Sequence, residues 1–277
     1  MAKEKQTPTL KCRTAWLSDI HLGYQGCKTE FLLDFLDKVE CDYLYLVGDI
    51  LDVQHMQEKG FYWPDSHNDV VEALFKKTKN NTKVFYIPGN HDEIFRQYDG
   101  LTFHNVEIHN RCIHQTIDGR RLLMMHGDEF DSVLNHHPII RSLGDISNDF
   151  ILFINRSLHK LHHTVGLPYF SYSGLIKRKI KHLIQHTSTI QKAVVEEAKK
   201  SAVDGIVCGH QHQAQIKNMN GILYCNDGDW VENCTTMVEH EDGTLELLRW
   251  REKVTSLSTC RPLHASAPNG GVANTIT

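Results

Sequence analysis

Side chains that bind metal ions follow several apolar runs of this 277-residue chain. Each run predicts a buried strand, and the polar side chains come just after the position where that strand ends. In open α/β sheets, reactive groups gather at the carboxyl ends of the strands. Seven residues stand at such positions, in the order Asp19, His21, Asp49, Asn90, His126, His210 and His212. Their spacing predicts that they share one site.

This mixture of oxygen and nitrogen ligands suits a pair of divalent cations. Two cations about 3.5–4 Å apart need ligands from several directions and one carboxylate that can bridge them. Imidazole suits Zn, Mn and Fe, whereas carboxylate and amide oxygens favour harder ions. Because side chains alternate along extended backbone, Asp19 and His21 can point to the same side, as can His210 and His212.

Apolar spacing predicts the elements that position these ligands. Asp118-Gly119 lies between two strand-like runs, which is the strongest short signal for a β-hairpin. Apolar residues at helical spacing over 29–39 predict a helix. Strands are expected at 13–18, 43–47, 83–87, within 112–125 and at 205–208. This order favours a mixed α/β fold, a four-layer αββα sandwich of two mixed sheets with a helical insertion that acts as a lid.

Charge and composition divide the chain into three parts. A catalytic domain is expected over 12–252, with the helical insertion at about 132–200. Residues 131–200 hold ten Lys and Arg against five Asp and Glu, a net charge of +5, so the rest of the chain carries −9. The tail at 253–277 is rich in Ser, Thr, Pro and Gly, which predicts disorder.

Bulk composition is that of a globular protein in the cytoplasm. Hydrophobic residues make up 40% and charged residues 23%, and the net charge is −4, so no nucleic-acid partner is expected. The eight cysteines show no C-x-x-C spacing, which favours reduced thiols. The polar amino terminus is unlike a secretory signal, and no run of about 18 apolar residues predicts a membrane span.

Five motifs together resemble those of the calcineurin-like metallophosphoesterase superfamily. They are D-x-H from Asp19, G-D-x-x-D around Asp49, G-N-H-D around Asn90, H-G-D from His126 and G-H-x-H around His210. The resemblance covers about residues 13–230. It implies one metal held by residues matching Asp19, His21, Asp49 and His212. The second metal is held by those matching Asp49, Asn90, His126 and His210.

The resemblance also implies roles for the two residues that follow Asn90. His91 matches the histidine beside the leaving-group oxygen, and Asp92 matches the carboxylate that orients it. In this interpretation His91 stabilises developing charge and donates a proton to the leaving group. The alternative, separate turn residues and surface histidines, has to explain five motifs independently.

Three further features resemble the bacterial UDP-2,3-diacylglucosamine pyrophosphohydrolases of lipid A synthesis. They are the insertion, the run from His126-Gly127-Asp128 to Asp131, and Asn-Asp-Gly-Asp-Trp at 226–230. These enzymes cleave a lipid-bearing UDP-sugar into UMP and a diacylglucosamine phosphate, with manganese and a helical lid. The resemblance implies two Mn ions, although the ligands also accept Zn or Fe, and a peripheral position on the cytoplasmic face of the inner membrane.

One departure leaves the substrate open. The UDP-2,3-diacylglucosamine pyrophosphohydrolases usually carry Asn-Arg-Asp where this chain has Asn90-His91-Asp92. Histidine at the middle position is the general choice of the calcineurin-like superfamily. Another phosphodiester or phosphomonoester, such as a nucleotide, a phospholipid-like diester or a phosphoprotein, is therefore an alternative. A binding scaffold without activity is a third hypothesis, but it would be expected to lack some ligands, and all are present.

The insertion supplies candidates for substrate binding. Its basic residues include Arg141, Arg156, Lys177 and Lys181, which can meet substrate phosphate or lipid headgroups. A solvated helix face explains them equally well. The apolar residues of the insertion can line an acyl pocket or pack against the core. The oligomeric state is left open.

Overall fold

The computed structural model describes residues 9–131 and 192–263. The chain divides into two compact units, one formed by Met1–Asp128 with Glu197–Thr277 and the other by Glu129–Glu196. Most of the second unit, and with it the predicted lid, lies outside the described residues. Within the described part of the expected insertion, residues 192–200 are helical.

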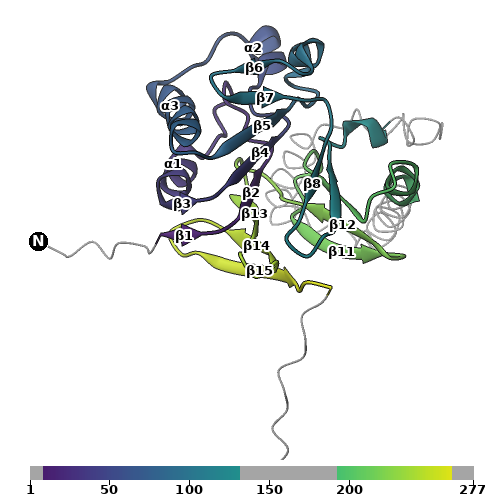
Figure 1. The fold of residues 1–277 in the computed structure, drawn as a ribbon. Coiled ribbons are helices and arrows are strands. Elements are labelled where there is room, and N and C mark those ends of the chain that lie inside the picture. The colour runs from purple at the N-terminus through teal and green to yellow at the C-terminus, as the bar shows by residue number, and fades with distance from the viewer. Residues whose placement is uncertain (1–8, 132–191, 264–277) are drawn as a thin grey trace, which may run out of the picture. The chain divides into compact units, whose positions relative to one another are not determined.

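The larger sheet has eight strands with a parallel centre (Figure 1). Its spatial order is β15 (Thr255–Cys260), β14 (Leu245–Arg249), β13 (Thr235–Glu239), β2 (Thr14–Leu17), β4 (Tyr43–Val47), β5 (Lys83–Ile87), β7 (Val106–Ile108) and β6 (Thr102–Phe103). The strands β2, β4, β5 and β7 are parallel, and the remaining pairs are antiparallel. A pair of two-residue strands, β1 (Leu10–Lys11) and β3 (Val39–Glu40), lies outside this sheet.

The smaller sheet has five strands and is also mixed. Its spatial order is β11 (Gln215–Met219), β12 (Ile222–Asn226), β10 (Gly205–Cys208), β9 (Arg121–Met124) and β8 (Cys112–Gln115). The three central strands are parallel, and the two edge strands are antiparallel to their neighbours. The prediction of a mixed α/β fold with two mixed sheets is therefore confirmed.

Two helices cover one face of the larger sheet. Helix α1 (Thr29–Lys38) follows β2 along the chain, and α3 (Asp65–Lys79) follows β4. They contact each other, and Figure 1 shows them side by side. Each buries a stripe at helical spacing, formed by Leu32, Phe35 and Leu36 in α1 and by His67, Val70 and Leu74 in α3. The shorter α2 (Val53–Lys59) buries no residue, and the Gln54 N–H in its first turn donates to the His91 carbonyl oxygen at 3.1 Å.

A second apolar core lies between the two sheets. Buried side chains from both sheets form one cluster, which includes Trp16, Tyr45, Val47, Ile87, Leu122, Met124, Val207 and Cys225. The rings of Trp16 and Tyr45 stack with centroids 5.9 Å apart. Because β2 and β4 bury both faces, they carry apolar residues continuously rather than alternately.

The predicted disorder from residue 253 onward is wrong for residues 255–260. They form β15, which pairs with β14 from Thr255 opposite Arg249 to Cys260 opposite Leu245. This edge strand is mostly exposed, so its sequence lacks an apolar pattern, and backbone hydrogen bonds to β14 hold it in place. Residues 264–277 lie outside the described part of the chain.

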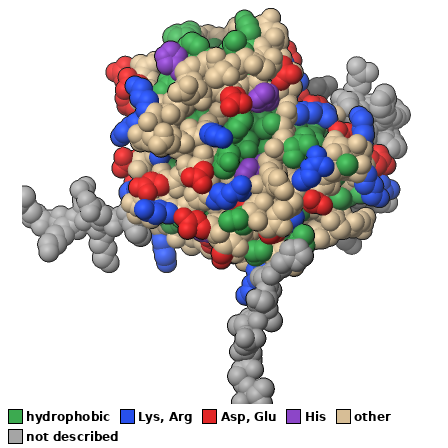
Figure 2. All heavy atoms as spheres, in the orientation of Figure 1, with side chains coloured by type: hydrophobic (Ala, Val, Ile, Leu, Met, Phe, Trp, Pro, Cys, Tyr) green, Lys and Arg blue, Asp and Glu red, His purple; other side chains and the backbone are tan. Residues whose placement is uncertain are grey.

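No helix within residues 9–131 and 192–263 is long and apolar enough to cross a membrane. Figure 2 shows acidic and basic side chains interspersed over the visible face of the molecule. This mixture of signs is consistent with the small net charge of the chain.

Candidate metal centre

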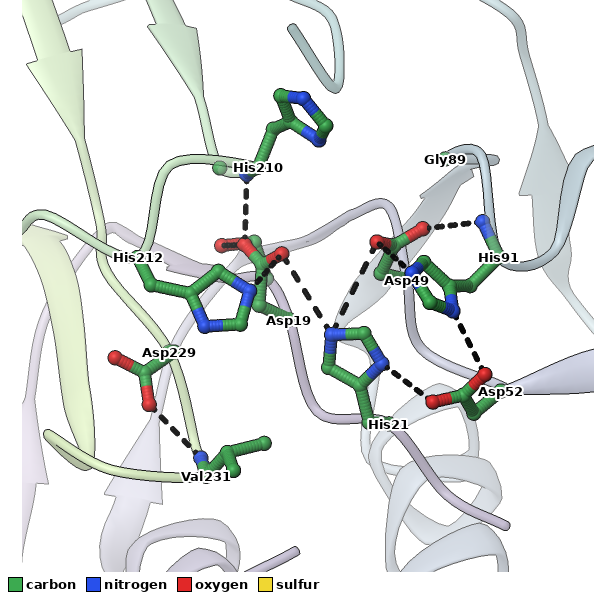
Figure 3. Close-up of polar contacts among 12 residues, drawn as sticks. Asp19, His21, Asp49, Asp52, Gly89, His91, His210, His212, Asp229 and Val231 are labelled. Atoms are coloured by element: carbon green, nitrogen blue, oxygen red, sulfur yellow. Dashed lines mark hydrogen bonds and ion pairs between the residues drawn. The ribbon is translucent and has the colours of Figure 1, made fainter. Parts of the chain in front are cut away.

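The predicted ligands lie in the loops that follow five strands. Asp19, Asp49 and Asn90 follow β2, β4 and β5 in the larger sheet, and His126 and His210 follow β9 and β10 in the smaller one. The strands within each set are parallel neighbours, so their carboxyl ends meet at one edge. Loops from both sheets therefore contribute to a single site, part of which is drawn in Figure 3.

Five of the seven ligands have an uncommon backbone conformation. The φ angles are 50° at Asp19, 55° at His21, 53° at Asp49, 65° at His210 and 52° at His212. Residues other than glycine adopt this left-handed region rarely, at about 1–3 kcal/mol each, and such strain clusters at functional sites. The fold therefore holds these side chains in place at the expense of stability.

Each of the two carboxylates has one oxygen held by protein donors and one turned toward the site. Asp19 Oδ2 accepts hydrogen bonds from the Ser18 hydroxyl at 2.6 Å and from the His210 backbone N–H at 2.9 Å. Asp49 Oδ1 accepts a hydrogen bond from the His91 backbone N–H at 2.8 Å. The remaining oxygens, Asp19 Oδ1 and Asp49 Oδ2, face imidazole nitrogens.

Three imidazoles converge on these two oxygens, and Figure 3 shows two of them, those of His21 and His212. His212 Nε2 lies 3.1 Å from Asp19 Oδ1, and His126 Nε2 lies 3.2 Å from Asp49 Oδ2. His21 Nε2 lies 3.9 Å from both oxygens. Asp49 Oδ2 therefore stands between histidines of two groups, which is the position that a bridging carboxylate requires.

The arrangement fits two cations. Within each of two groups, the candidate ligand atoms lie within 4.8 Å of one another; the groups are Asp19, His21 and His212, and Asp49, His126 and His210. Four buried atoms of the predicted ligands have no hydrogen-bond partner among the described residues: Asp19 Oδ1, His21 Nε2, Asn90 Oδ1 and His126 Nε2. Because a buried polar atom without a partner is costly, these atoms indicate a bound group that satisfies them.

Hydrogen bonds fix which imidazole nitrogen is turned toward the cations. His126 Nδ1 lies 2.9 Å from the Val47 carbonyl oxygen, which can only accept, so Nδ1 carries the proton. His21 Nδ1 lies 2.9 Å from Asp52 Oδ2 in the same role. Nε2 of both rings is thereby available as a ligand.

The electrostatics of the site attract positive charge. Burial lowers the pKa of His126, but the Asp49 carboxylate outweighs burial and raises this pKa to about 10. Asp19 likewise raises the pKa of His212 against the effect of burial. Although burial opposes it, His126 holds the pKa of Asp49 well below its ordinary value. When metal is absent, His126 and His212 therefore hold protons to higher pH, and metal binding releases these protons.

Glycines stand where the backbone passes closest to the ligands. A Cβ atom on Gly89 would overlap Asp49 Oδ1, and one on Gly209 would overlap Asp19 Oδ2. These close approaches explain why the G-N-H-D and G-H-x-H motifs begin with glycine.

His91 lies beside Asp49 and is held by Asp52. Its Nδ1 lies 2.7 Å from Asp52 Oδ1, and its Nε2 lies 4.0 Å from Asp49 Oδ2. The hydrogen bond to Asp52 raises the pKa of His91 against the effect of burial. Asp52 therefore has the orienting role that the sequence analysis gave to Asp92, and that part of the prediction is wrong. The second aspartate of the G-D-x-x-D motif was the available signal for Asp52.

Asp92 instead joins two of the ligand loops. Its Oδ2 accepts hydrogen bonds from the Ile50 N–H at 2.8 Å and from the Tyr86 hydroxyl at 2.5 Å. Its Oδ1 accepts one from the Gly89 N–H at 2.5 Å. Because Asp92 is fully buried and bound to both loops, it positions the segment that carries Asp49 against the segment that carries Asn90.

Residues of the 226–230 motif support the site from behind. The Ser18 hydroxyl lies 2.7 Å from Asp227 Oδ1, and burial raises the pKa of Asp227 well above its ordinary value. Asn233 Nδ2 bridges Asp229 Oδ2 at 2.6 Å and the His212 carbonyl oxygen at 3.2 Å. Asp227 and Asp229 follow a strand, as the metal ligands do, so the sequence alone could not distinguish their supporting roles from metal binding.

The structure brings the predicted metal ligands, His91 and Asp92 together in one cluster of loops. The four candidates for substrate binding, Arg141, Arg156, Lys177 and Lys181, lie outside the described residues.

Comparison with known protein families matches residues 12–214 to the calcineurin-like phosphoesterases. Among solved structures, vacuolar protein sorting 29 from Cryptosporidium parvum aligns with 90% of this chain and 97% of its own, at 17% identity and a TM-score of 0.47. The matched range of the family contains every predicted ligand.

Two curated relatives match parts of the chain. The DNA polymerase II small subunit of Methanothermobacter thermautotrophicus is 28% identical over 149 residues, which cover 43% of this chain and 31% of the relative. The UDP-2,3-diacylglucosamine hydrolase of Chromohalobacter salexigens is 32% identical over 122 residues, 42% of this chain and 46% of the relative. The matches therefore span less than half the length of either relative.

Proposed function

Because the chain belongs to the calcineurin-like phosphoesterase family, we propose that it hydrolyses the pyrophosphate bond of UDP-2,3-diacylglucosamine to UMP and 2,3-diacylglucosamine 1-phosphate. Family membership makes the chain a metal-dependent hydrolase of phosphoric esters. The lipid-bearing nucleotide sugar is the finer part of the proposal. The partial similarity to the Chromohalobacter salexigens hydrolase and the motif resemblances of the sequence support it.

The observation that carries the hydrolase function is the position of Asp49 Oδ2. It lies 3.2 Å from His126 Nε2 and 3.9 Å from His21 Nε2, and both of these nitrogens are buried without a hydrogen-bond partner among the described residues. A carboxylate between two unsatisfied imidazoles is what a dinuclear centre needs.

In this proposal two divalent cations occupy the centre. One is held by Asp19, His21, Asp49 and His212, and the other by Asp49, Asn90, His126 and His210. When bound, such a pair lowers the pKa of water and neutralises charge on phosphate oxygens. Manganese is proposed for both positions, although imidazole and carboxylate ligands also accept zinc or iron.

His91 acts on the leaving group. Its Nδ1 is engaged by Asp52 at 2.7 Å, so Nε2 is the nitrogen that can donate toward the substrate. The raised pKa keeps the ring protonated to higher pH. A protonated imidazole beside the phosphate stabilises the departing oxygen and transfers a proton to it.

Hydrolysis of another phosphodiester or phosphomonoester is the second candidate. It is favoured by His91, since the diacylglucosamine hydrolases that the chain resembles carry arginine at this position. His91, oriented by Asp52, can protonate an alkoxide leaving group, which is a strong base. A phosphate leaving group is a weaker base and depends less on such a proton donor.

The proposed substrate places the enzyme at the cytoplasmic face of the inner membrane. Its acyl chains are anchored in the bilayer, so the protein must contact the surface peripherally to reach them. Contact through the basic insertion, with Arg141, Arg156, Lys177 and Lys181 meeting phosphate, belongs to this proposal.

The direct test offers diacylated UDP-glucosamine to the purified, manganese-loaded protein. UMP is expected as a product and is measured by chromatography. Asp49→Ala should lose both turnover and bound manganese, which is measured by mass spectrometry of the metal, because it removes the shared ligand. Hydrolysis of bis(p-nitrophenyl) phosphate without UMP release would favour the second candidate. Retained manganese and turnover in Asp49→Ala would contradict the dinuclear centre itself.

A further inference from the structure

A pocket of about 480 Å³ opens beside the metal centre. It is lined by Val53, Gln54 and Gln57 of α2, by Asn90 and His91 of the loop after β5, and by Glu93, Ile94 and Gln97 of the 3-10 helix Glu93–Tyr98. Its size is in the range of small-ligand sites. Because Asn90 and His91 belong to the centre, a group attached to the phosphate bound there can extend into this pocket.

The charge of the pocket disfavours a second anionic group. Among the described residues, those that line the pocket include no Lys or Arg. The basic residue of the same 3-10 helix, Arg96, is bound to Asp128, with Nη2 2.8 and 2.9 Å from the two carboxylate oxygens. Glu93 adds a carboxylate that is exposed in the pocket wall. A further phosphate or carboxylate would be repelled here.

The polarity of the pocket disfavours an acyl chain. Four carboxamides line it, those of Gln54, Gln57, Asn90 and Gln97. Two have their amide nitrogen engaged: Gln54 Nε2 donates to Glu58 Oε1 and Gln97 Nε2 donates to the Ile94 carbonyl oxygen, each at 2.9 Å. Their oxygens are thereby left to accept hydrogen bonds. An acyl chain would bury these polar groups without compensation, which is costly.

We propose that this pocket binds the sugar ring attached to the phosphate, with Gln57 and Glu93 accepting hydrogen bonds from its hydroxyl groups. A carboxylate that accepts from sugar hydroxyls is an established mode of ribose binding. Val53 and Ile94 offer apolar surface to the C–H face of the ring. The inference rests on the proposed hydrolase function and adds to it a neutral, hydroxyl-rich group as a determinant of specificity.

Two sources of this chemistry are the ribose of a nucleotide and a hexosamine. Titration calorimetry of the manganese-loaded protein with UMP, glucosamine 1-phosphate and phenyl phosphate distinguishes them. One sugar phosphate is expected to bind about tenfold more tightly than phenyl phosphate, as one or two hydrogen bonds would provide. A preference for UMP identifies the ribose, and a preference for glucosamine 1-phosphate identifies the hexosamine.

Substitutions in the pocket should reduce this preference. Gln57→Ala and Glu93→Ala are each expected to weaken the preferred sugar phosphate about fivefold relative to phenyl phosphate, since each removes one hydrogen bond. The matched control is Gln115→Ala on the exposed side of β8, which should keep the wild-type preference.

Two results would overturn the pocket assignment: no preference for either sugar phosphate over phenyl phosphate, or a preference that both pocket variants keep in full. The measurement is of binding, so it is independent of the UMP-release test. A protein that prefers a sugar phosphate but hydrolyses no phosphoric ester would support the pocket and contradict the proposed function.

Discussion

Asp52 connects the metal centre to the residue beside the leaving group. Its Oδ2 lies 2.9 Å from His21 Nδ1 and its Oδ1 lies 2.7 Å from His91 Nδ1. Despite burial, these two imidazoles hold the pKa of Asp52 well below its ordinary value, so it is ionised at neutral pH. One carboxylate therefore orients a metal ligand and a proton donor together.

Replacement of Asp52 with asparagine should change the pH dependence of turnover. The hydrogen bond from Asp52 raises the pKa of His91, so the protonated donor persists to higher pH in the wild type. In Asp52→Asn this pKa falls, and the alkaline limb of the kcat profile should move to lower pH. At neutral pH, kcat should fall about 10- to 100-fold. An unchanged alkaline limb, at wild-type manganese content, would contradict the role of Asp52.

At the scale of residues, the ligands were predictable because each follows an apolar run. Supporting roles were not, because they depend on which side chains face one another after folding. Asp92 follows His91 directly, yet its carboxylate binds the Ile50 N–H at 2.8 Å, and the more distant Asp52 binds the His91 ring instead. Adjacency in sequence is a poor guide to hydrogen bonding where the backbone turns sharply.

The loops after the parallel strands are shaped by how closely they pass the ligands. Gly48 joins β4 to Asp49 with a φ of +84°, and a Cβ atom there would overlap the ring of His126. Gly100 has a similar φ of +82° and nothing within 4 Å of the same position. The two glycines therefore differ in their surroundings rather than in their backbone conformation.

Gly48→Ala should displace His126 and weaken metal binding. The overlap should destabilise the metal-free protein by about 1–3 kcal/mol beyond the backbone cost, measured by urea unfolding. Manganese affinity, measured by equilibrium dialysis, should fall at the same time. Gly100→Ala isolates the backbone cost of a positive φ, about 1 kcal/mol, and should keep the metal. Equal effects of both variants would show that crowding of His126 is not what Gly48 prevents.

Among the elements, those with strong local signals were predicted and the polar edge strands were not. The β8–β9 hairpin was found from Asp118-Gly119, and Gly119 has the positive φ, +87°, that such turns use. The edge strands β6, β11 and β15 are short or largely exposed, so they lack an apolar pattern. Backbone pairing with a neighbouring strand defines them: β6 pairs with β7, β11 with β12 and β15 with β14.

In the larger unit, the two sheets are joined both by a core and by the ligand set. The order of strands was not predictable, because β13 pairs with β2 across more than two hundred residues, with Met237 opposite Trp16. Ligands come from both sheets, since Asp19 and Asp49 follow strands of the larger one and His126 follows a strand of the smaller one. Bound cations would therefore crosslink the sheets at their carboxyl edges.

Removal of metal should accordingly destabilise this unit as a whole. Cations that bind only the folded state add about 3–4 kcal/mol at 100 to 1,000 times their dissociation constant, so chelation should lower the Tm by about 10 °C. Scanning calorimetry with manganese or with a chelator measures the difference. Asp49→Ala is the control, and its Tm should not respond to manganese because the ligand proposed to bridge the two cations is gone. A wild-type Tm that is equally insensitive would mean that the seven side chains hold no cation in the folded protein, and that the unsatisfied buried atoms have another explanation.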